Sequence, residues 1–186
     1  MSFLEQHHPS LAIPVPIERI VEMGLGLDII PFPDLKRCRD LDGFLSSDGE
    51  AIYVDQAQLE KSLHRYRFTL AHEVSHLLLH LDLYREAAPK TLAEYLAFQE
   101  SFDGDLRNAY EFQAMNVAGR ILLPRAPFVR CAGAVLSGLQ ARIRETADAR
   151  TICELLASHV APRFEVSEEV AFRRLWGDRL CDEIGL

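Results

Sequence analysis

Apolar residues recur along this chain first at the spacing of short strands and then at the spacing of helices. Residues 27–32 form an apolar run ended by prolines, which is typical of a strand. Two more apolar runs, 44–45 and 51–54, flank Ser47-Asp48-Gly49, a sequence suited to a hairpin turn. Helical spacing predicts helices over residues 17–24, 65–83, 91–99, 107–122, 149–159 and 168–176. A few strands followed by a helical majority indicate an α+β fold.

Several residues mark the expected ends of these helices. Gly24 is expected to end the first helix, Pro124 to close helix 107–122, and Pro162 to stop helix 149–159. Ser167 is expected to cap the N-terminus of the last helix, because its hydroxyl can accept a hydrogen bond from a free backbone N–H. The sequence before residue 13 reads as an N-terminal tail.

The composition is typical of a water-soluble globular protein. Of the 186 residues 48% are hydrophobic and 26% charged, which is enough for a core. The net charge of −8 disfavours direct nucleic-acid binding, which depends on positive charge. We expect no membrane association, because no run approaches the ~20 apolar residues of a spanning helix. The first residues also lack the pattern of a signal peptide, so we expect a cytoplasmic protein.

The four cysteines are widely spaced and form no CxxC pair; they are Cys38, Cys131, Cys153 and Cys181. Zinc sites built from thiolates usually contain such close pairs, so a cysteine metal site is disfavoured. In a cytoplasmic protein we expect all four to be reduced thiols.

The most informative motif is HExxH, formed by His72, Glu73 and His76 on the predicted helix 65–83. At about 100° per residue, the two histidines lie one turn apart on one side of the helix, with Glu73 beside them. A different side is apolar; its residues are Leu70, Val74, Leu77, Leu78 and Leu81. Two such imidazoles can bind one Zn²⁺, and the carboxylate of Glu73 can take a proton from a metal-activated water. The alternative is a pair of surface histidines without a metal.

A catalytic zinc site needs a third protein ligand. The downstream candidates are His80, Asp82, Glu86, Glu94, Glu100, Asp103, Asp105 and Glu111. Three successive turns of a straight helix span about 12 Å, so His80 is better placed to contact a ligand, or to face solvent, than to bind the same ion. Glu111 is expected to open another helix, with Ala114 and Ala118 on its face. From the residues alone, Glu111 is equally a metal ligand or an acid that stabilises a helix N-terminus.

Two sequence blocks resemble the ImmA/IrrE family of metallopeptidases. They are RFTLAHEVSHLLLH at residues 67–80 and the E-x-x-A segment that starts at Glu111 and ends in ILLP. The upstream segments PVPIERIVEMGLGLDIIP and DGFLSSDGEAIYVD agree in order. The resemblance implies a minimal zincin-like fold with a small, about three-stranded sheet, an HExxH active-site helix and a helical C-terminal part. The family is similar to the gluzincins, and the resemblance therefore implies that Glu111 is the third metal ligand beside His72 and His76.

The expected division of the chain is a tail at residues 1–12, a zincin-like metallopeptidase domain at 13–130 and a helical C-terminal subdomain at 131–186. The resemblance also implies an activity. The expected activity is that of a cytoplasmic zinc endopeptidase with Glu73 as general base, which cleaves a helix-turn-helix repressor in transcription regulation or a stress response. An edge strand within residues 50–54 is expected to hold the substrate by main-chain pairing. Manganese or iron are alternative metals, and the oligomeric state stays open.

The sequence departs from the family pattern at Met115, where the family usually has an asparagine that could orient a metal ligand. This favours an alternative in which the chain is a catalytically weak or inactive zincin that acts as a partner-binding or toxin-like module. A second alternative is a DNA-binding regulator that uses Arg173 and Arg174 of the C-terminal helices. Tyr53, Tyr110 and His80 are candidates for stabilising an oxyanion, and the sequence does not choose among them.

Overall fold

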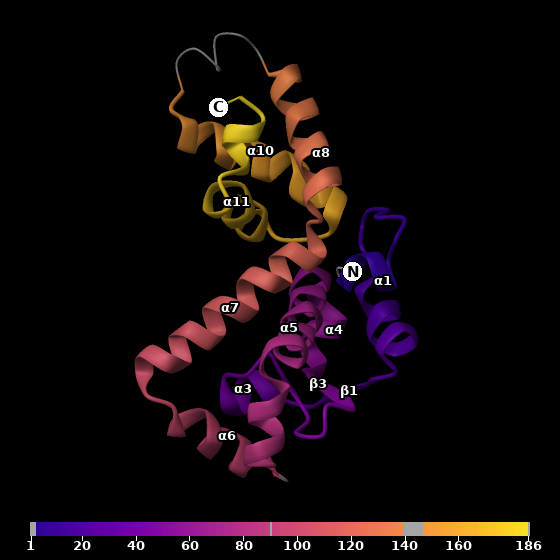
Figure 1. Cartoon of the computed structure of the whole chain (residues 1–186), viewed down its shortest axis with the longest axis vertical. Helices are drawn as coiled ribbons and strands as arrows, with labels where there is room; N and C mark the ends of the chain where they lie inside the picture. The colour runs from indigo at the N-terminus through magenta and orange to yellow at the C-terminus, as the bar shows by residue number, and fades with distance from the viewer. Residues whose placement is uncertain (1–2, 90, 140–146, 186) are drawn as a thin grey trace. The chain divides into compact units, whose positions relative to one another are not determined.

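The computed structural model describes residues 3–89, 91–139 and 147–185 (Figure 1). It contains two compact units, one formed by residues 17–118 and the other by residues 1–16 together with 119–186. The domain boundaries expected at residues 12 and 130 stay predictions, because a compact unit and an independently folding domain are different properties.

The first unit, residues 17–118, contains a three-stranded sheet in the order β1-β3-β2. Its strands are β1 (Asp28–Phe32), β2 (Gly43–Leu45) and β3 (Ala51–Asp55). The predicted hairpin is confirmed, since β2 pairs antiparallel with β3, and Gly49 in its turn adopts a positive φ of 76°. Together with the helical majority, this sheet confirms the predicted α+β fold.

The position of β3 corrects one expectation. β1 pairs with β3 in parallel, on the side that β2 does not cover. The segment of residues 50–54 therefore contributes to the central strand, and the prediction that it contains an edge strand is wrong. The hairpin is a local feature that turn residues reveal, whereas a parallel pairing between distant segments depends on the course of the whole chain.

Helices surround the sheet within the first unit. They are α2 (Ile17–Arg19), the π-helical turn η1 (Ile20–Leu25), α3 (Leu35–Arg39), α4 (Gln56–Lys61), α5 (Leu63–Ala87), α6 (Leu92–Ser101) and the larger part of α7 (Gly104–Leu122). The first helical segment ends at Gly26, with φ 72°, rather than at Gly24. The apolar spacing along the chain did not predict α3 and α4. The helix α4 is capped by the carboxylate of Asp55, which accepts a hydrogen bond from the N–H of Ala57.

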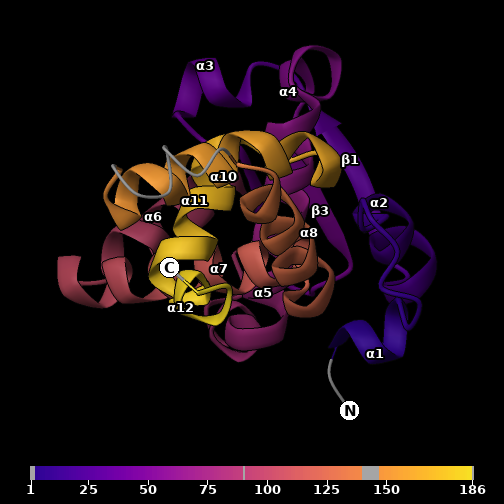
Figure 2. The same ribbon diagram turned by 90° about the horizontal axis from the view of Figure 1, so that it is seen from above.

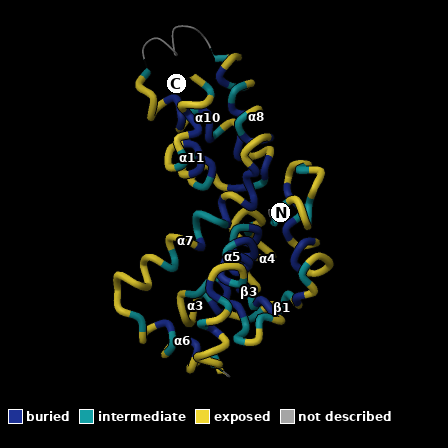
Figure 3. The backbone as a smooth tube through the Cα atoms, viewed as in Figure 1, coloured by how far each residue is buried: buried dark blue, intermediate teal, exposed yellow. Residues whose placement is uncertain are grey.

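The long helix α5 packs against β2 and β3. The apolar side of α5 is buried at Leu70 and Val74, whereas Leu78 is 45% exposed. Figure 3 shows both buried and exposed segments along this helix. Gly43 permits a close approach of α5 to β2, because a Cβ there would lie 2.6 Å from Cγ2 of Thr69 on α5. The sheet also contributes to an aromatic cluster with α5 and α6, whose buried members are Leu35, Phe44, Tyr84 and Tyr95.

The second unit is helical. It contains α1 (Phe3–His7), the end of α7, α8 (Arg125–Gly138), α10 (Ala149–Phe164), α11 (Glu168–Gly177) and α12 (Leu180–Glu183). The last four are grouped together (Figure 2), and α10 packs against both α8 and α11. The hydroxyl of Ser167 accepts a hydrogen bond from the N–H of Val170, which confirms the predicted N-cap. Pro162 lies inside α10, so the predicted stop there is wrong: the helix continues to Phe164, which is buried against Phe128.

The cysteines do not all match the expectation of reduced thiols. Cys153 of α10 and Cys181 of α12 form a disulfide, with their Cα atoms 6.8 Å apart. Cys38 is a free, exposed thiol and Cys131 a free, buried one. Structural disulfides are rare in cytosolic proteins, so the cytoplasmic location stays a prediction. Among the helices that the structure describes, none is long and apolar enough to cross a membrane.

Candidate metal centre

The helix α5 brings the two histidines of the HExxH motif together. They lie one turn apart, and Nε2 of His72 is 3.0 Å from Nε2 of His76. His76 is buried, and His72 is partly buried. Because side chains at i and i+4 of a helix lie one above the other, this convergence follows directly from the spacing in the sequence.

Glu111 reaches the same point from α7. Its Oε2 lies 3.2 Å from Nε2 of His72, and its Oε1 lies 3.7 Å from Nε2 of His76. The helix α7 starts at Gly104, so Glu111 lies about two turns inside it. The expectation that Glu111 opens a helix is wrong, and with it the interpretation as a helix N-terminal acid. Ala114, on the neighbouring turn, is fully buried.

The side chains of His72, His76 and Glu111, called the three-ligand group below, fit a divalent metal ion. Their nitrogen and oxygen atoms all lie within 4.8 Å of one another. Tetrahedral zinc with bonds of about 2.0–2.1 Å separates its ligand atoms by roughly 3.3 Å. The separations of 3.0, 3.2 and 3.7 Å are close to that value. Two imidazoles and one carboxylate also make up a donor set common in catalytic zinc sites.

Burial and neighbouring charges shift the pKa values of the three-ligand group apart. Burial, with the nearby charge of His72, lowers the pKa of His76 to about 3, so His76 is neutral at physiological pH. Burial alone would lower the pKa of His72, but its hydrogen bond to Glu111 and the charge of Glu73 together raise it. Burial would likewise raise the pKa of Glu111, and the same hydrogen bond to His72 lowers it overall. The hydrogen bond between His72 and Glu111 therefore favours the charged form of each of these two side chains.

Glu73 is a buried carboxyl group beside the three-ligand group. Only 4% of the residue is exposed, and burial raises its pKa from 4.5 to about 7. It accepts a hydrogen bond from the backbone of Leu45 in β2, while its Oε2 has no hydrogen-bond partner within the described part of the chain. A buried acceptor that lacks a partner costs free energy, so such atoms are often found where a reacting group binds.

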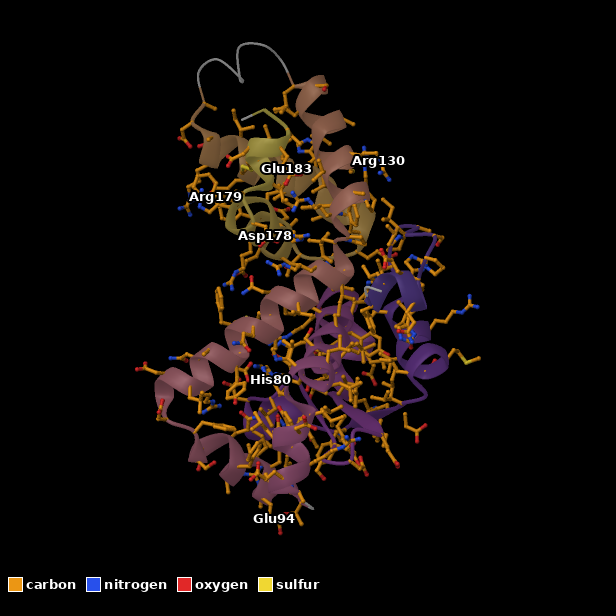
Figure 4. The ribbon with its side chains drawn as sticks, in the orientation of Figure 1. His80, Glu94, Arg130, Asp178, Arg179 and Glu183 are labelled. Carbon is orange, nitrogen blue, oxygen red and sulfur yellow. A yellow bond between two sulfur atoms is a disulfide. The ribbon has the colours of Figure 1, made fainter. Side chains whose placement is uncertain are left out.

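The structure separates His80 from the other candidate ligands. His80 is buried between α5 and α7 (Figure 4), with Nδ1 3.0 Å from Nδ1 of His76 and Nε2 3.1 Å from Oε1 of Gln113. Both its ring nitrogens are thus engaged, and it is not part of the three-ligand group. The remaining acidic candidates are exposed; they are Asp82, Glu86, Glu94, Glu100, Asp103 and Asp105.

Two further candidates for stabilising an oxyanion lie near aromatic residues. Tyr53 is stacked on Phe44 with ring centroids 4.6 Å apart, within the aromatic cluster of the sheet. Tyr110 packs edge-on against the ring of His80, with centroids 4.5 Å apart. A pocket opens beside the three-ligand group, and its wall includes His76, Phe98, Phe102, Arg107, Tyr110 and Glu111. Of these two tyrosines, only Tyr110 lines that pocket.

Two functional contacts were missed from the sequence. The backbone of Leu45 contacts Glu73, and the amide of Gln113 contacts His80. Backbone contacts leave no signal in side-chain types. Gln113 occupies a variable position of the E-x-x-A segment, so only its place two residues after Glu111 could have drawn attention to it.

A helix with an HExxH motif, a carboxylate from a second helix and a small mixed sheet define a metallopeptidase of the zincin-like class. Residues 25–175 match the family profile described as the IrrE N-terminal-like domain, peptidase family M78, and the chain belongs to that family. The resemblance seen in the sequence is thereby confirmed. No curated protein and no solved structure matches the chain.

Proposed function

We propose that this chain is a zinc-dependent endopeptidase in which His72, His76 and Glu111 bind the metal and Glu73 is the general base. The observation that carries the proposal is the convergence of three ligand atoms, one from each side chain and all within 4.8 Å of one another, beside the partnerless Oε2 of a buried carboxyl group. Zinc suits this donor set, and manganese or iron are alternatives that metal supply would decide.

The roles of the side chains follow from their chemistry. A bound divalent metal would act as a Lewis acid, lowering the pKa of a water molecule and polarising the peptide carbonyl. Glu73, a buried carboxyl group beside the three-ligand group, would accept a proton from the attacking water and donate it to the leaving nitrogen. The N–H of Leu45 holds one end of that carboxyl group, so the partnerless Oε2 carries the proton.

The sheet edge that would bind a substrate is β2. Because β3 is central, main-chain pairing with a peptide can use only β1 or β2, and α5 packs against β2. The peptide groups of Gly43 and Leu45 point away from β3, since the flanking residues Asp42 and Ser46 form the hydrogen bonds to it. The N–H of Leu45 already donates to Glu73, so a peptide would pair with the remaining backbone groups of this edge. A peptide added to this edge would pass close to Glu73.

The substrate we propose is a helix-turn-helix transcriptional repressor, cleaved in the cytoplasm during transcription regulation or a stress response. Membership of the ImmA/IrrE-type family supports this proposal. Comparing new protein N-termini in cells that produce the wild type or Glu73→Gln would identify the substrate. We expect a cut in one regulatory protein that occurs with the wild type alone, and cleavage that persists in the variant would contradict the role of Glu73.

Elemental analysis of purified protein tests the metal site itself. We expect about one zinc per chain in the wild type, strong loss of zinc in Glu111→Ala and retention of zinc in Glu73→Gln. A matched control is Glu86→Gln, which changes an exposed carboxylate on α5. A wild type that binds no zinc, or a Glu111→Ala variant that binds it equally well, would overturn the assignment.

The second candidate function is a weak or inactive zincin that binds a regulatory partner. Met115 favours it, because a thioether is a poor substitute for an asparagine that orients a ligand. The next residue does not compensate, since Nδ2 of Asn116 donates to the carbonyl of Phe112 in its own helix. A stable complex with an intact partner would favour this function, whereas turnover of the partner excludes it.

The DNA-binding alternative finds little support in the helical unit. Arg174 is buried, donates to the carbonyl of Leu123 and forms an ion pair with Asp178. Arg173 forms an ion pair with Glu169 at 2.6 Å. Both arginines are thus engaged within their own unit, and specific recognition of a duplex would require them at base edges or phosphates.

A further inference from the structure

His80 is the one histidine of α5 beyond the motif that contacts a proposed metal ligand. It lies one turn after His76 and is only 4% exposed. Its Nδ1 is 3.0 Å from Nδ1 of His76, and its Nε2 is 3.1 Å from Oε1 of Gln113 on α7. The ring of Tyr110 packs edge-on against it. His80 is therefore held from α5 and α7 alike, on the side of His76 that faces away from His72.

The proton positions along these contacts follow from the position of the ligand atoms. A neutral imidazole carries one proton, and Nε2 of His76 points at the three-ligand group, where it must offer a lone pair. The proton of His76 then lies on Nδ1 and is donated to Nδ1 of His80. His80 in turn carries its proton on Nε2 and donates it to the carbonyl oxygen of Gln113. Each close contact then contains one hydrogen, and no two lone pairs face each other.

We propose that His80 and Gln113 are positioning residues that fix the tautomer and ring orientation of His76 for metal binding. This inference rests on the proposed function, since it assigns a partner to a proposed ligand. Ligand histidines usually donate their second N–H to a carboxylate, a carbonyl or a water, and the partner raises the basicity of the ligand. Here the acceptor for the second N–H of His76 is His80, which in turn donates to Gln113. This hydrogen-bond chain orients His76 without any contribution from the residue at position 115.

The buried environment makes this relay hard to replace by water. His76 and His80 are both buried, and Tyr110 covers the ring of His80. Loss of the acceptor on His80 would leave the N–H of His76 unpaired in a buried site, which costs free energy unless the ring turns. A turned ring would move Nε2 away from the three-ligand group. We therefore expect weaker metal binding even though no ligand is removed.

The experiment compares zinc affinity by competition with a chromophoric chelator at fixed pH. His80→Phe keeps a ring but lacks both nitrogens, and we expect it to weaken zinc binding by about 10–100-fold. His80→Gln retains an acceptor and a donor, and it should rescue affinity to within about threefold of the wild type. Gln113→Met removes the acceptor at an exposed residue and should weaken binding, whereas Gln113→Glu should not. A matched control on α7 is Asn116→Leu, which we expect to leave affinity unchanged.

A spectroscopic measurement separates orientation from general stability. Long-range ¹⁵N–¹H correlation spectra of the zinc-loaded wild type should show His76 protonated on Nδ1 and His80 on Nε2. A His80 protonated on Nδ1 would overturn the proposal, as would a His80→Phe variant that folds and binds zinc as tightly as the wild type. If that variant does not fold, Gln113→Met and the spectra decide. Zinc binding that depends on Glu111 but not on His80 would overturn this inference alone, whereas absence of zinc binding would overturn the proposed function with it.

Discussion

The buried carboxyl group of Glu73 should make the stability of the metal-free protein depend on pH in a way that one substitution can isolate. Burial raises its pKa from 4.5 to about 7. A group whose pKa is higher in the folded state contributes stability that is complete below the unfolded pKa and is lost as pH rises through the folded one. The free energy of unfolding contributed by Glu73 is therefore lost between about pH 4.5 and pH 7. Above pH 7 the loss is complete, because the carboxylate is then ionised within the fold.

The magnitude follows from the two pKa values. At 1.36 kcal/mol per pKa unit, ionisation of Glu73 lowers the free energy of unfolding by about 3 kcal/mol at pH 8 and by about 1 kcal/mol at pH 5. Glutamine is neutral at both pH values. On going from pH 5 to pH 8, the stability of Glu73→Gln relative to the wild type should therefore increase by about 2–3 kcal/mol, or roughly 5–10 °C in Tm for a chain of this length.

Urea denaturation in the presence of a chelator at pH 5, 6, 7 and 8 measures this difference. Titrating groups that do not interact with Glu73 cancel in the comparison of variant and wild type, whereas His72 does not cancel fully because the charge of Glu73 raises its pKa. Glu86→Gln on the same helix serves as the exposed control. We expect the control to show no such change with pH. Parallel stability curves for Glu73→Gln and the wild type would refute the reasoning, since they would mean that Glu73 ionises in the fold as readily as in water. A positive result would also show that the site retains an acid which lowers stability, as functional sites often do.

Three more predictions concern the packing of Gly43, the pH dependence of zinc binding and position 115. Gly43→Ala places a Cβ 2.6 Å from both Cγ2 of Thr69 and the carbonyl oxygen of Tyr53, so the free energy of unfolding should fall by about 1–3 kcal/mol. An unchanged urea midpoint would show that both α5 and β3 can move away from β2 at this point. Zinc affinity should fall by about tenfold for each pH unit below the raised pKa of His72, because His72 must release its proton before it can bind zinc. His76 has a pKa of about 3, so it is already neutral in this pH range and releases no proton. Competition titrations between pH 6 and pH 8 measure that slope, and a flat profile contradicts it. Met115→Asn should tighten zinc binding by up to about 10-fold, and weaker binding would argue against an orienting role for that position.

Local features of the site could be predicted from the sequence because they depend on residues a few positions apart. His72 and His76 meet since i and i+4 share one side of a helix, whichever fold surrounds it. The hairpin of β2 and β3 and the N-cap at Ser167 are local in the same sense. Pro162 shows the limit, because a proline pattern predicts a stop, whereas packing around Phe164 carries α10 two residues further.

Contacts between distant segments could not be predicted in this way. Glu111 was one of eight candidate ligands, and its selection as the proposed third ligand needed either the family resemblance or the distances to His72 and His76. The central position of β3 likewise depends on its parallel pairing with β1, which lies more than 20 residues earlier in the chain. Such contacts depend on how helices and strands that lie far apart in the sequence pack together. The apolar spacing predicts each helix or strand by itself and is compatible with several ways of packing them.

By itself the sequence determined that the chain has an α+β fold, that α5 presents two histidines and a glutamate at metal-binding spacing, and that the family is that of the ImmA/IrrE metallopeptidases. Only the tertiary structure decided that α7 brings Glu111 within 3.2 Å of His72, that Glu73 is buried against β2, and that His80 and Gln113 continue from His76. The physical reason is that helix periodicity fixes the direction of side chains on one element, whereas ligand distances, burial and pKa depend on which elements pack together.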